Sequence, residues 1–405
     1  MTPLAVDARH WWRASGALER YLTDLVAVEV RILRPGGPWP PHIDPHQVRT
    51  TTLGPDGLGL DSLECIAVAA ALSEALHLHR GGLADTLLTA PLLGAWVDAA
   101  AAALDRFSDL MTVRSSGSTG RSRSHVHKTD ALAMEVGLWA EMLPGRRRIR
   151  TAVACHHIYG FLFTLMLPAA MALPVEDARS FSPGAVAATM RPGDVIIGHP
   201  VFWDSLLRAA PSGWPPDVIG VTSGAPCAAA IFSGVRAAGL LRLIDVYGSS
   251  ETAGIGWRDE PAAYQLLPLW ERRQDGVQAA SGGPAAALPD RLDWDGGQRF
   301  RIGARNDGAV MVGGINVDLG RVRAVLREHP DVADAVVRLM RPSEGARLKA
   351  FLKPLEDSSV NVEALRLSVL DFAEARLSVP ERPRAYRFGR DLPQSETGKP
   401  TDWDV

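Results

Sequence analysis

Residues Ser115–Lys128 read SSGSTGRSRSHVHK, and this stretch is the most informative one in the chain. It is too rich in hydroxyl and charged side chains to be a core strand, because buried polar groups without partners are costly. Gly117 and Gly120 permit positive φ angles, so successive backbone N–H groups can turn inward around an anion. The segment therefore indicates either a loop that binds phosphate or a solvated surface turn.

This loop differs from a P-loop, because no Gly-Lys-Ser/Thr follows at the required spacing. Its backbone N–H groups and hydroxyls are donors for phosphate oxygens, and an arginine adds a fixed positive charge. The candidate phosphate-binding residues are Ser116, Gly117, Ser118, Thr119, Gly120 and Arg123.

The 405-residue chain is 46% apolar and 22% charged, which is typical of a soluble globular protein of two or three domains. A formal net charge of −3 argues against a general nucleic-acid binder. The three cysteines, Cys65, Cys155 and Cys227, form no C-x-x-C pair, so neither a zinc site nor a disulfide framework is indicated. No signal peptide or membrane span is evident, and we expect a cytoplasmic protein without nucleic-acid or membrane partners.

Three regions differ in their pattern. Residues 1–107 are predicted to be a helical module, with helices over 11–33, 63–76 and 92–104. Residues 108–307 alternate short β-branched runs with helical segments, as an α/β sheet does. The strands expected there are TAVAC (151–155), DVIIGHP (194–200), DVIGVTSG (217–224) and LRLIDVYGSS (241–250).

Residues 308–405 form the third region, which reads as strand, Gly-Gly turn, helix, two strands, helix and polar tail. The elements expected after the turn cover 319–328, 333–340, 347–353 and 362–377. The expected fold is therefore a large α/β core with a small α+β C-terminal domain, preceded by the helical N-terminal module.

Five segments resemble, in order, motifs of the adenylate-forming superfamily, which includes acyl- and aryl-CoA synthetases, luciferases and peptide-synthetase adenylation domains. Each motif alone is weak, but the ordered set covers roughly residues 110–405. The segments are SSGSTG (115–120), HHIYG (156–160), VYGSSETAG (246–254), LPD (288–290) with GARND (303–307), and SETGKP (395–400).

The resemblance implies that the protein uses ATP to convert a carboxylic acid to an acyl-adenylate and then transfers the acyl group to a thiol. The thiol would belong to CoA or to the phosphopantetheine of an acyl carrier protein, and the small domain would rotate about a hinge at Asp307 between the steps. Attack of a carboxylate on the α-phosphorus brings two anions together. Cationic groups, N–H groups and Mg²⁺ are therefore needed to neutralise the pyrophosphate that leaves.

By this resemblance, the catalytic residues are Lys399, Glu251 and His157, with Glu251 as a Mg²⁺ ligand at a strand end. Simpler alternatives are a solvated lysine for Lys399, a loop carboxylate for Glu251, a surface ion pair for Asp290 with Arg305, and a core ring for Tyr247. The residues expected to border adenine and ribose are Ser223, Gly224, Ala225, Tyr247, Gly248, Ser249, Ser250, Asp290 and Arg305.

The segment HHIYGFLFTLMLP carries no acidic residue, whereas amino-acid-activating relatives use one to hold the ammonium group. An aryl or acyl acid is therefore favoured, with His157 and Phe161 as pocket walls or, alternatively, as core residues. A looser resemblance of HVHKT and the helix after it to bacterial aryl-acid ligases favours an aromatic acid. The chain departs from the family in two ways: Ser122-Arg123-Ser124 replaces Pro-Lys-Gly, and the region before the phosphate loop is short.

The segment GLGLDSLECIAVAAALSEALHL (57–78) resembles an acyl-carrier domain, in which Ser62 would carry 4′-phosphopantetheine at a helix start. An ordinary N-capped helix packed on the main domain is the alternative.

Two other classes of function are open. One is an acyltransferase or hydrolase that uses Cys155 and His156, although adjacent residues on a strand point to opposite faces. The other is a non-catalytic, carrier-binding scaffold.

Overall fold

The structure is a computed structural model that describes residues 7–34, 43, 47–115, 123–274, 276–306, 308–313, 315–345, 347–355, 362–393 and 401–404. The chain divides into two compact units. The first comprises residues within 1–115, 124–288 and 294–301, and the second those within 116–123, 289–293 and 302–405.

The N-terminal segment is helical, as predicted. Asp61 caps the helix that begins at Ser62: its side chain accepts from the backbone N–H of Glu64, whose side chain accepts from the Asp61 N–H. The helix predicted over 11–33 is interrupted, because Gly16 adopts φ 69°. The elements are η1 (Ala8–Arg13), α1 (Ala17–Leu33), η2 (Val48–Thr50), α2 (Ser62–Ala75), η3 (Leu78–Gly81), α3 (Ala84–Thr89) and α4 (Leu93–Leu104).

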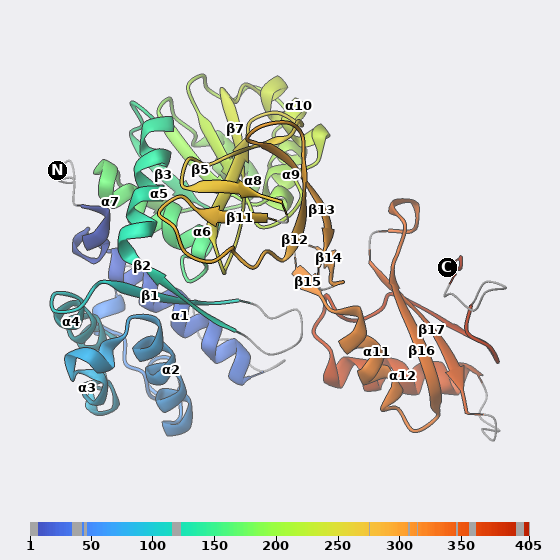
Figure 1. Cartoon of the computed structure of the whole chain (residues 1–405). Coiled ribbons are helices and arrows are strands. Elements are labelled where there is room, and N and C mark those ends of the chain that lie inside the picture. The colour runs from blue at the N-terminus through green and yellow to red at the C-terminus, as the bar shows by residue number, and fades with distance from the viewer. Residues whose placement is uncertain are drawn as a thin grey trace. The chain divides into compact units, whose positions relative to one another are not determined.

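No boundary of the two units lies at residue 107. The largest hydrophobic core runs from Ala8 to Leu267 and includes both the fully buried Trp96 of α4 and Trp139 of the next region. Figure 1 shows the N-terminal helices, in blue, beside the β1–β2 hairpin. The N-terminal helices therefore share one core with the sheet of the first unit, because their apolar faces are buried against it.

A nine-stranded sheet has the order β12-β13-β9-β8-β7-β6-β5-β3-β4. Neighbours from β4 to β7 pair in parallel, whereas β7–β8, β8–β9 and β9–β13 pair antiparallel. Its strands are β3 (Arg148–Thr151), β4 (Val175–Asp177), β5 (Asp194–Gly198), β6 (Ile219–Thr222), β7 (Arg242–Ser249), β8 (Ala253–Arg258), β9 (Tyr264–Leu266), β12 (Asp290–Trp294) and β13 (Arg299–Arg305).

The parallel strands are buried on both faces; β5 and β6, for example, have only buried residues. Since these strands run in one direction, their carboxyl ends lie along one edge of the sheet. The connecting helices are α5 (Thr129–Met142), α6 (Ile158–Phe161), the π-helical η4 (Leu162–Met166), α7 (Leu167–Met171), α8 (Pro183–Ala188), α9 (Pro200–Ala209) and α10 (Ala229–Ala238).

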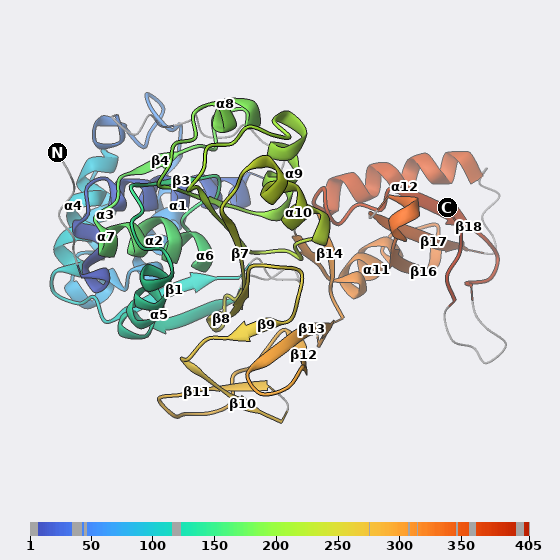
Figure 2. The same cartoon turned by 90° about the horizontal axis from the view of Figure 1, so that it is seen from above.

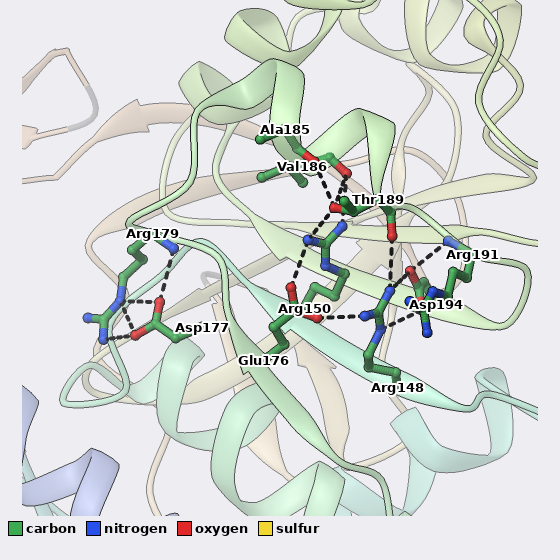
Figure 3. Close-up of polar contacts among 10 residues, drawn as sticks. All are labelled: Arg148, Arg150, Glu176, Asp177, Arg179, Ala185, Val186, Thr189, Arg191 and Asp194. Atoms are coloured by element: carbon green, nitrogen blue, oxygen red, sulfur yellow. Dashed lines mark hydrogen bonds and ion pairs between the residues drawn. The ribbon is translucent and has the colours of Figure 1, made fainter. Parts of the chain in front are cut away.

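The strand predicted over 151–155 was placed too late, because β3 ends at Thr151. Its sequence, RIRT, has two arginines, so the strand does not show the apolar run expected of a buried strand. Figure 3 shows the reason: Arg150, with no exposed surface, pairs with Glu176 at 2.8 Å, and Arg148 pairs with Asp194 at 2.7 Å. Ion pairs thus neutralise two guanidinium groups within the sheet.

Two hairpins complete the first unit. β1 (Leu110–Arg114) pairs antiparallel with β2 (Ser124–Lys128), and β10 (Trp270–Arg273) pairs antiparallel with β11 (Gly276–Ala279). The candidate phosphate loop connects β1 to β2.

The second unit contains the small α+β domain that was predicted. Its core joins α12 to a three-stranded sheet of order β16-β17-β18, and Figure 2 shows α12 alongside this sheet. The elements are β14 (Val310–Val312), β15 (Ile315–Val317), α11 (Leu319–Arg327), β16 (Val332–Leu339), η5 (Pro342–Glu344), β17 (Leu348–Pro354), α12 (Val362–Arg376) and β18 (Ala385–Phe388). The strand β18 was not predicted.

Within the part of the chain that the structure describes, no helix has both the length and the apolar composition needed to cross a bilayer.

Candidate active site

The turn between β7 and β8 carries the predicted Tyr-Gly motif and Glu251. A Cβ atom on Gly248 would lie 2.2 Å from the carbonyl oxygen of Ala253, so only glycine fits there. The hydroxyls of Ser249 and Thr252 are 3.0 Å apart, and Ala253 has φ 59°, which is strained for a residue with a side chain. This tight turn places Glu251 at the carboxyl end of β7.

Two histidines of β2 face this turn. The Nε2–H of His127 donates to the carbonyl oxygen of Ser250 at 2.8 Å, and Nε2 of His125 lies 3.5 Å from a carboxylate oxygen of Glu251. Both come from one face of the strand, since alternate residues of a strand share a face. Burial lowers the pKa of His127, so its ring is held neutral. The strand that leaves the candidate phosphate loop therefore contacts the motif that carries Glu251.

No role was predicted for these two histidines; the alternation His-Val-His directly after the loop was the signal in the sequence. The loop residues Ser116, Gly117, Ser118, Thr119 and Gly120 lie outside the described residues, and Arg123 is the residue that precedes β2.

A buried carboxylate on α5 is hydrogen-bonded to the residue that follows this turn. Glu135 of α5 accepts from the backbone N–H of Gly254 at 3.0 Å and from the indole N–H of Trp139 at 2.9 Å. The indole N–H of Trp270 donates to the carbonyl oxygen of Gly254 at 2.7 Å. Both backbone groups of Gly254 are thus held by side chains. A lone glutamate on an otherwise apolar helix face was the only sequence signal for Glu135.

We expect Glu135 to make the stability of the protein depend on pH. Burial raises its pKa from 4.5 to about 7. The folded state therefore holds the proton more tightly between these values, and stability falls as pH rises through this window, by up to about 3 kcal/mol. Glu135→Gln, which cannot ionise, should remove this slope in urea unfolding between pH 5 and 8. Glu141→Gln, at an exposed position of α5, is the matched control and should retain it; an unchanged slope in Glu135→Gln contradicts the assignment.

The HHIYG segment follows β3 and is held closely. The hydroxyl of Tyr159 lies 3.0 Å from the carbonyl oxygens of both Gly198 and Val221, at the ends of β5 and β6. A Cβ atom on Gly160 would lie 1.9 Å from the carbonyl oxygen of Ala154. Only glycine therefore allows α6 to pack this closely against the loop that precedes it. The segment is therefore fixed against three strand ends.

His157 and Phe161 differ in their surroundings. His157 is exposed, yet desolvation by the surrounding protein lowers its pKa. Phe161 has no exposed surface and packs edge-to-face against Trp11 and Tyr21, with ring centroids 5.0 and 6.0 Å away. These are the contacts of a core residue, whereas the pocket role of His157 stays a prediction.

The segment after β6 contacts β7, the strand that leads into the turn with Glu251. The hydroxyl of Ser223 donates to the carbonyl oxygen of Val246 at 2.7 Å, and Gly224, which precedes Ala225, has φ 85°. Tyr247 is only 7% exposed and contacts Tyr264 and Phe300, with ring centroids 5.9 and 5.7 Å away. Its predicted stacking on adenine remains a prediction.

A pocket of about 230 Å³ opens at the same edge, where β3, β4 and β5 end. Ala152 follows β3, Ala178 follows β4 and His199 follows β5, and Phe202 supplies an aromatic wall.

The second unit holds the remaining candidates. Asp290 begins β12 and Arg305 ends β13, and their side chains lie 3.8 Å apart and are largely buried. Asp307 and Lys399 lie outside the described residues.

The residues that flank 394–400 are anchored. The backbone N–H of Thr401 donates to the carbonyl oxygen of Pro393 at 2.9 Å. Lys349, with no exposed surface, lies 3.0 Å from a carboxylate oxygen of Asp402 and donates to the carbonyl oxygen of Trp403 at 2.5 Å. The polar tail predicted from sequence thus contains a packed tryptophan, because Trp403 is only 8% exposed.

Cys155 does not have the properties of a nucleophile. It is 3% exposed, and burial raises the pKa of its thiol well above the usual value, so the reactive thiolate is suppressed. This observation disfavours the acyltransferase alternative with Cys155 and His156.

Residues 98–320 match the family model described as AMP-binding enzyme, and residues 322–399 match that of the AMP-binding enzyme C-terminal domain. A 4-coumarate–CoA ligase of Rhodobacter capsulatus is 40% identical, covering 86% of this chain and 91% of the relative. That of Cereibacter sphaeroides is 34% identical, covering 86% and 84%. The solved structure of o-succinylbenzoate CoA synthetase from Bacillus subtilis matches with a TM-score of 0.59 at 19% identity, covering 72% of this chain and 67% of that one, which shows a shared fold.

These comparisons bear on the N-terminal helices. A match over 86% of the chain is more than residues 108–405 could supply, so the resemblance to the ligases extends into residues 1–107. Ser62 is exposed at the start of α2, but nothing confirms an acyl-carrier segment.

Proposed function

Because the chain belongs to the family of AMP-binding enzymes, which activate carboxylic acids with ATP and transfer them to a thiol, we propose that it is an aryl acid–CoA ligase whose substrate is an aryl-propenoic acid of the 4-coumarate type. The observation that carries the proposal is the 40% identity to a 4-coumarate–CoA ligase over nearly the whole of both chains. The absence of an acidic residue from HHIYGFLFTLMLP agrees with an acid that has no amine.

In the first step, a carboxylate oxygen of the acid attacks the α-phosphorus of ATP, and the bond to pyrophosphate breaks. The loop 116–120 with Arg123 would hold the phosphates, Asp290 would accept the ribose hydroxyls, and Lys399 would stabilise charge between the carboxylate and the phosphate. Tyr247 to Ser250 and the Ser223–Ala225 segment would border the nucleotide. Each group would act by its position and charge, so the rate of adenylation would depend on how precisely the loops at the strand ends hold these groups.

Glu251 fits a Mg²⁺ ligand, because its carboxylate is partly exposed at the end of β7 and this ion takes one or two carboxylates together with substrate phosphates. Bound there, the ion would neutralise charge on pyrophosphate. Among the described residues, no group of three or more His, Cys, Asp or Glu side chains forms a metal site without the nucleotide.

In the second step, the thiol sulfur of CoA attacks the acyl carbon, and the bond to phosphate breaks to release AMP. The C-terminal domain, residues 308–405, would rotate about Asp307 between the steps, which would withdraw Lys399 and admit the thiol. His157 would border the acyl group in both steps. Free CoA is preferred to a carrier arm on Ser62, because the relatives are named as CoA ligases.

The proposal is tested with a panel of aryl, aryl-propenoic and aliphatic acids, each with ATP, Mg²⁺ and CoA. We expect acid-dependent release of pyrophosphate, fastest with aryl-propenoic acids, and a CoA thioester found by mass spectrometry. Intact mass after incubation with CoA and a broad phosphopantetheinyl transferase should show no added arm, with Ser62→Ala as control. Absence of pyrophosphate release with every acid overturns the ligase assignment, and an arm lost in Ser62→Ala restores the carrier interpretation.

A further inference from the structure

One buried carboxylate joins the N-terminal helices to the HHIYG segment. Asp24 of α1 is 6% exposed, and its two oxygens accept from different segments. Oδ2 accepts from the backbone N–H of Cys155 at 2.7 Å, and Oδ1 accepts from a guanidinium N–H of Arg179 at 2.7 Å. Asp24 therefore connects three parts of the chain: α1, the loop after β3 and the segment after β4.

The bond to Cys155 bears directly on the predicted acid site. Cys155, whose backbone N–H makes this bond, lies two residues before His157. Both residues lie in the loop after β3, where pairing with neighbouring strands no longer fixes the backbone. A carboxylate is costly to bury unless it is paired and hydrogen-bonded, and removing one partner of such a pair leaves an uncompensated buried charge. The position of the loop that carries His157 is therefore set by a residue more than one hundred positions earlier.

The other end of the segment is held by the same N-terminal region. Trp11 and Tyr21 pack edge-to-face on Phe161, and their own ring centroids are 5.6 Å apart. Such aromatic pairs add about 1 kcal/mol beyond burial and favour one geometry. Residues 155–161 are thus held at both ends by residues 11–24.

The negative charge of Asp24 affects the electrostatic environment of His156 and His157. Burial lowers the pKa of His156 to about 2, so this ring is neutral, and neither of its nitrogens has a hydrogen-bond partner within the described part of the chain. Arg179 lies close enough to lower that pKa further. Asp24, together with Asp177, balances the charge of Arg179 (Figure 3 shows the Arg179–Asp177 pair). Loss of Asp24 would remove one of the two negative charges that face Arg179, next to both histidines.

From this geometry we propose that Asp24 is a positioning residue for the acid-binding site, so that the N-terminal helices take part in acid selection. The kinetic test of this inference rests on the proposed ligase function. The hydrogen bond from Cys155 to Asp24, which we call the tether, does not depend on that function. Its role is to hold the loop that carries His157, and it does not contact the reacting atoms.

The chain offers a closely matched control in Asp194. This residue is 1% exposed, pairs with Arg148 at 2.7 Å and accepts from the backbone N–H of Arg191 at 2.9 Å. It lies at the start of β5, at the opposite edge of the sheet from His157, within the network drawn in Figure 3. Asp24→Asn and Asp194→Asn therefore remove similar buried charges at different places.

The kinetic test compares both variants with the parent protein on a panel of acids. Asp24→Asn should raise the KM for the acid about tenfold or more and compress the differences between acids, while the KM for ATP changes less than about twofold. Asp194→Asn should lower thermal stability without altering acid preference. Equal effects of the two variants, or unchanged acid KM and preference in Asp24→Asn, overturn the proposal.

A second measurement does not need activity. Hydrogen–deuterium exchange of peptides covering 155–161 should be faster in Asp24→Asn and unchanged in Asp194→Asn. Unchanged exchange in Asp24→Asn overturns the tether, even if the parent protein proves not to be a ligase. Should Asp24→Asn fail to fold, Asp24→Glu keeps the charge but displaces the carboxylate from the N–H of Cys155, and should show the same faster exchange; unchanged exchange of 155–161 in Asp24→Glu would likewise overturn the tether.

Discussion

Replacing Lys399 by alanine is expected to lower acyl-adenylate formation by about 100- to 1000-fold, because the lysine stabilises charge that develops in the transition state. As a compact charge on a long side chain, it can reach a carboxylate and a phosphate together. Further along the chain, Asp402 and Trp403 are anchored to the buried Lys349.

The two half-reactions separate this role from a general defect. Acid-dependent pyrophosphate release should fall in Lys399→Ala, whereas conversion of a synthetic acyl-adenylate and CoA to thioester should be nearly unchanged. Lys353→Ala removes a lysine of β17 that pairs weakly with Asp391, at 3.9 Å, and should leave both steps intact. If Lys399→Ala and the parent release pyrophosphate at equal rates with a good acid, the assignment of Lys399 is wrong.

Glu251→Gln is expected to lower adenylation by about 100-fold and to raise the Mg²⁺ concentration needed for half-maximal rate, because a neutral amide is a weaker ligand for a hard cation. Its carboxylate is about one-third exposed and lies 3.5 Å from the ring of His125, so the substitution keeps the shape of the turn while removing the charge.

Titration of Mg²⁺ at saturating ATP and acid, with pyrophosphate release as the signal, measures this effect. Glu260→Gln changes an exposed carboxylate after β8 and serves as the control. An unaltered Mg²⁺ dependence in Glu251→Gln would remove Glu251 from the metal site.

Several features could be predicted from local sequence. The small α+β domain followed from the turn at Gly313 and the alternating apolar positions of residues 310–377, because strand and helix periods are encoded over short windows. The motif that carries Glu251 was expected at a strand end, and β7 does end there. The boundary expected near residue 307 lies five residues after Ile302, where the second unit resumes.

The N-terminal region shows where local pattern is insufficient. Residues 63–76 were expected to be helical and are, but the resemblance to a carrier domain, with Ser62 at the helix start, depended on the same local signals as any capped helix. Only packing distinguishes a separate module from part of a larger core. Here Trp96 and the other buried side chains of α4 share the core of the sheet.

The residues that support the site were visible only in three dimensions. Glu135 reaches Gly254 across 119 positions, and Asp24 reaches Cys155 across 131. A sequence shows each carboxylate but not its partner, because the pairing is made when distant segments pack together and bury the charge. Motif order and strand periodicity therefore identified the family and the end of β7, whereas tertiary packing decided which buried side chains hold the functional loops, since desolvation and hydrogen bonding act between neighbours in space.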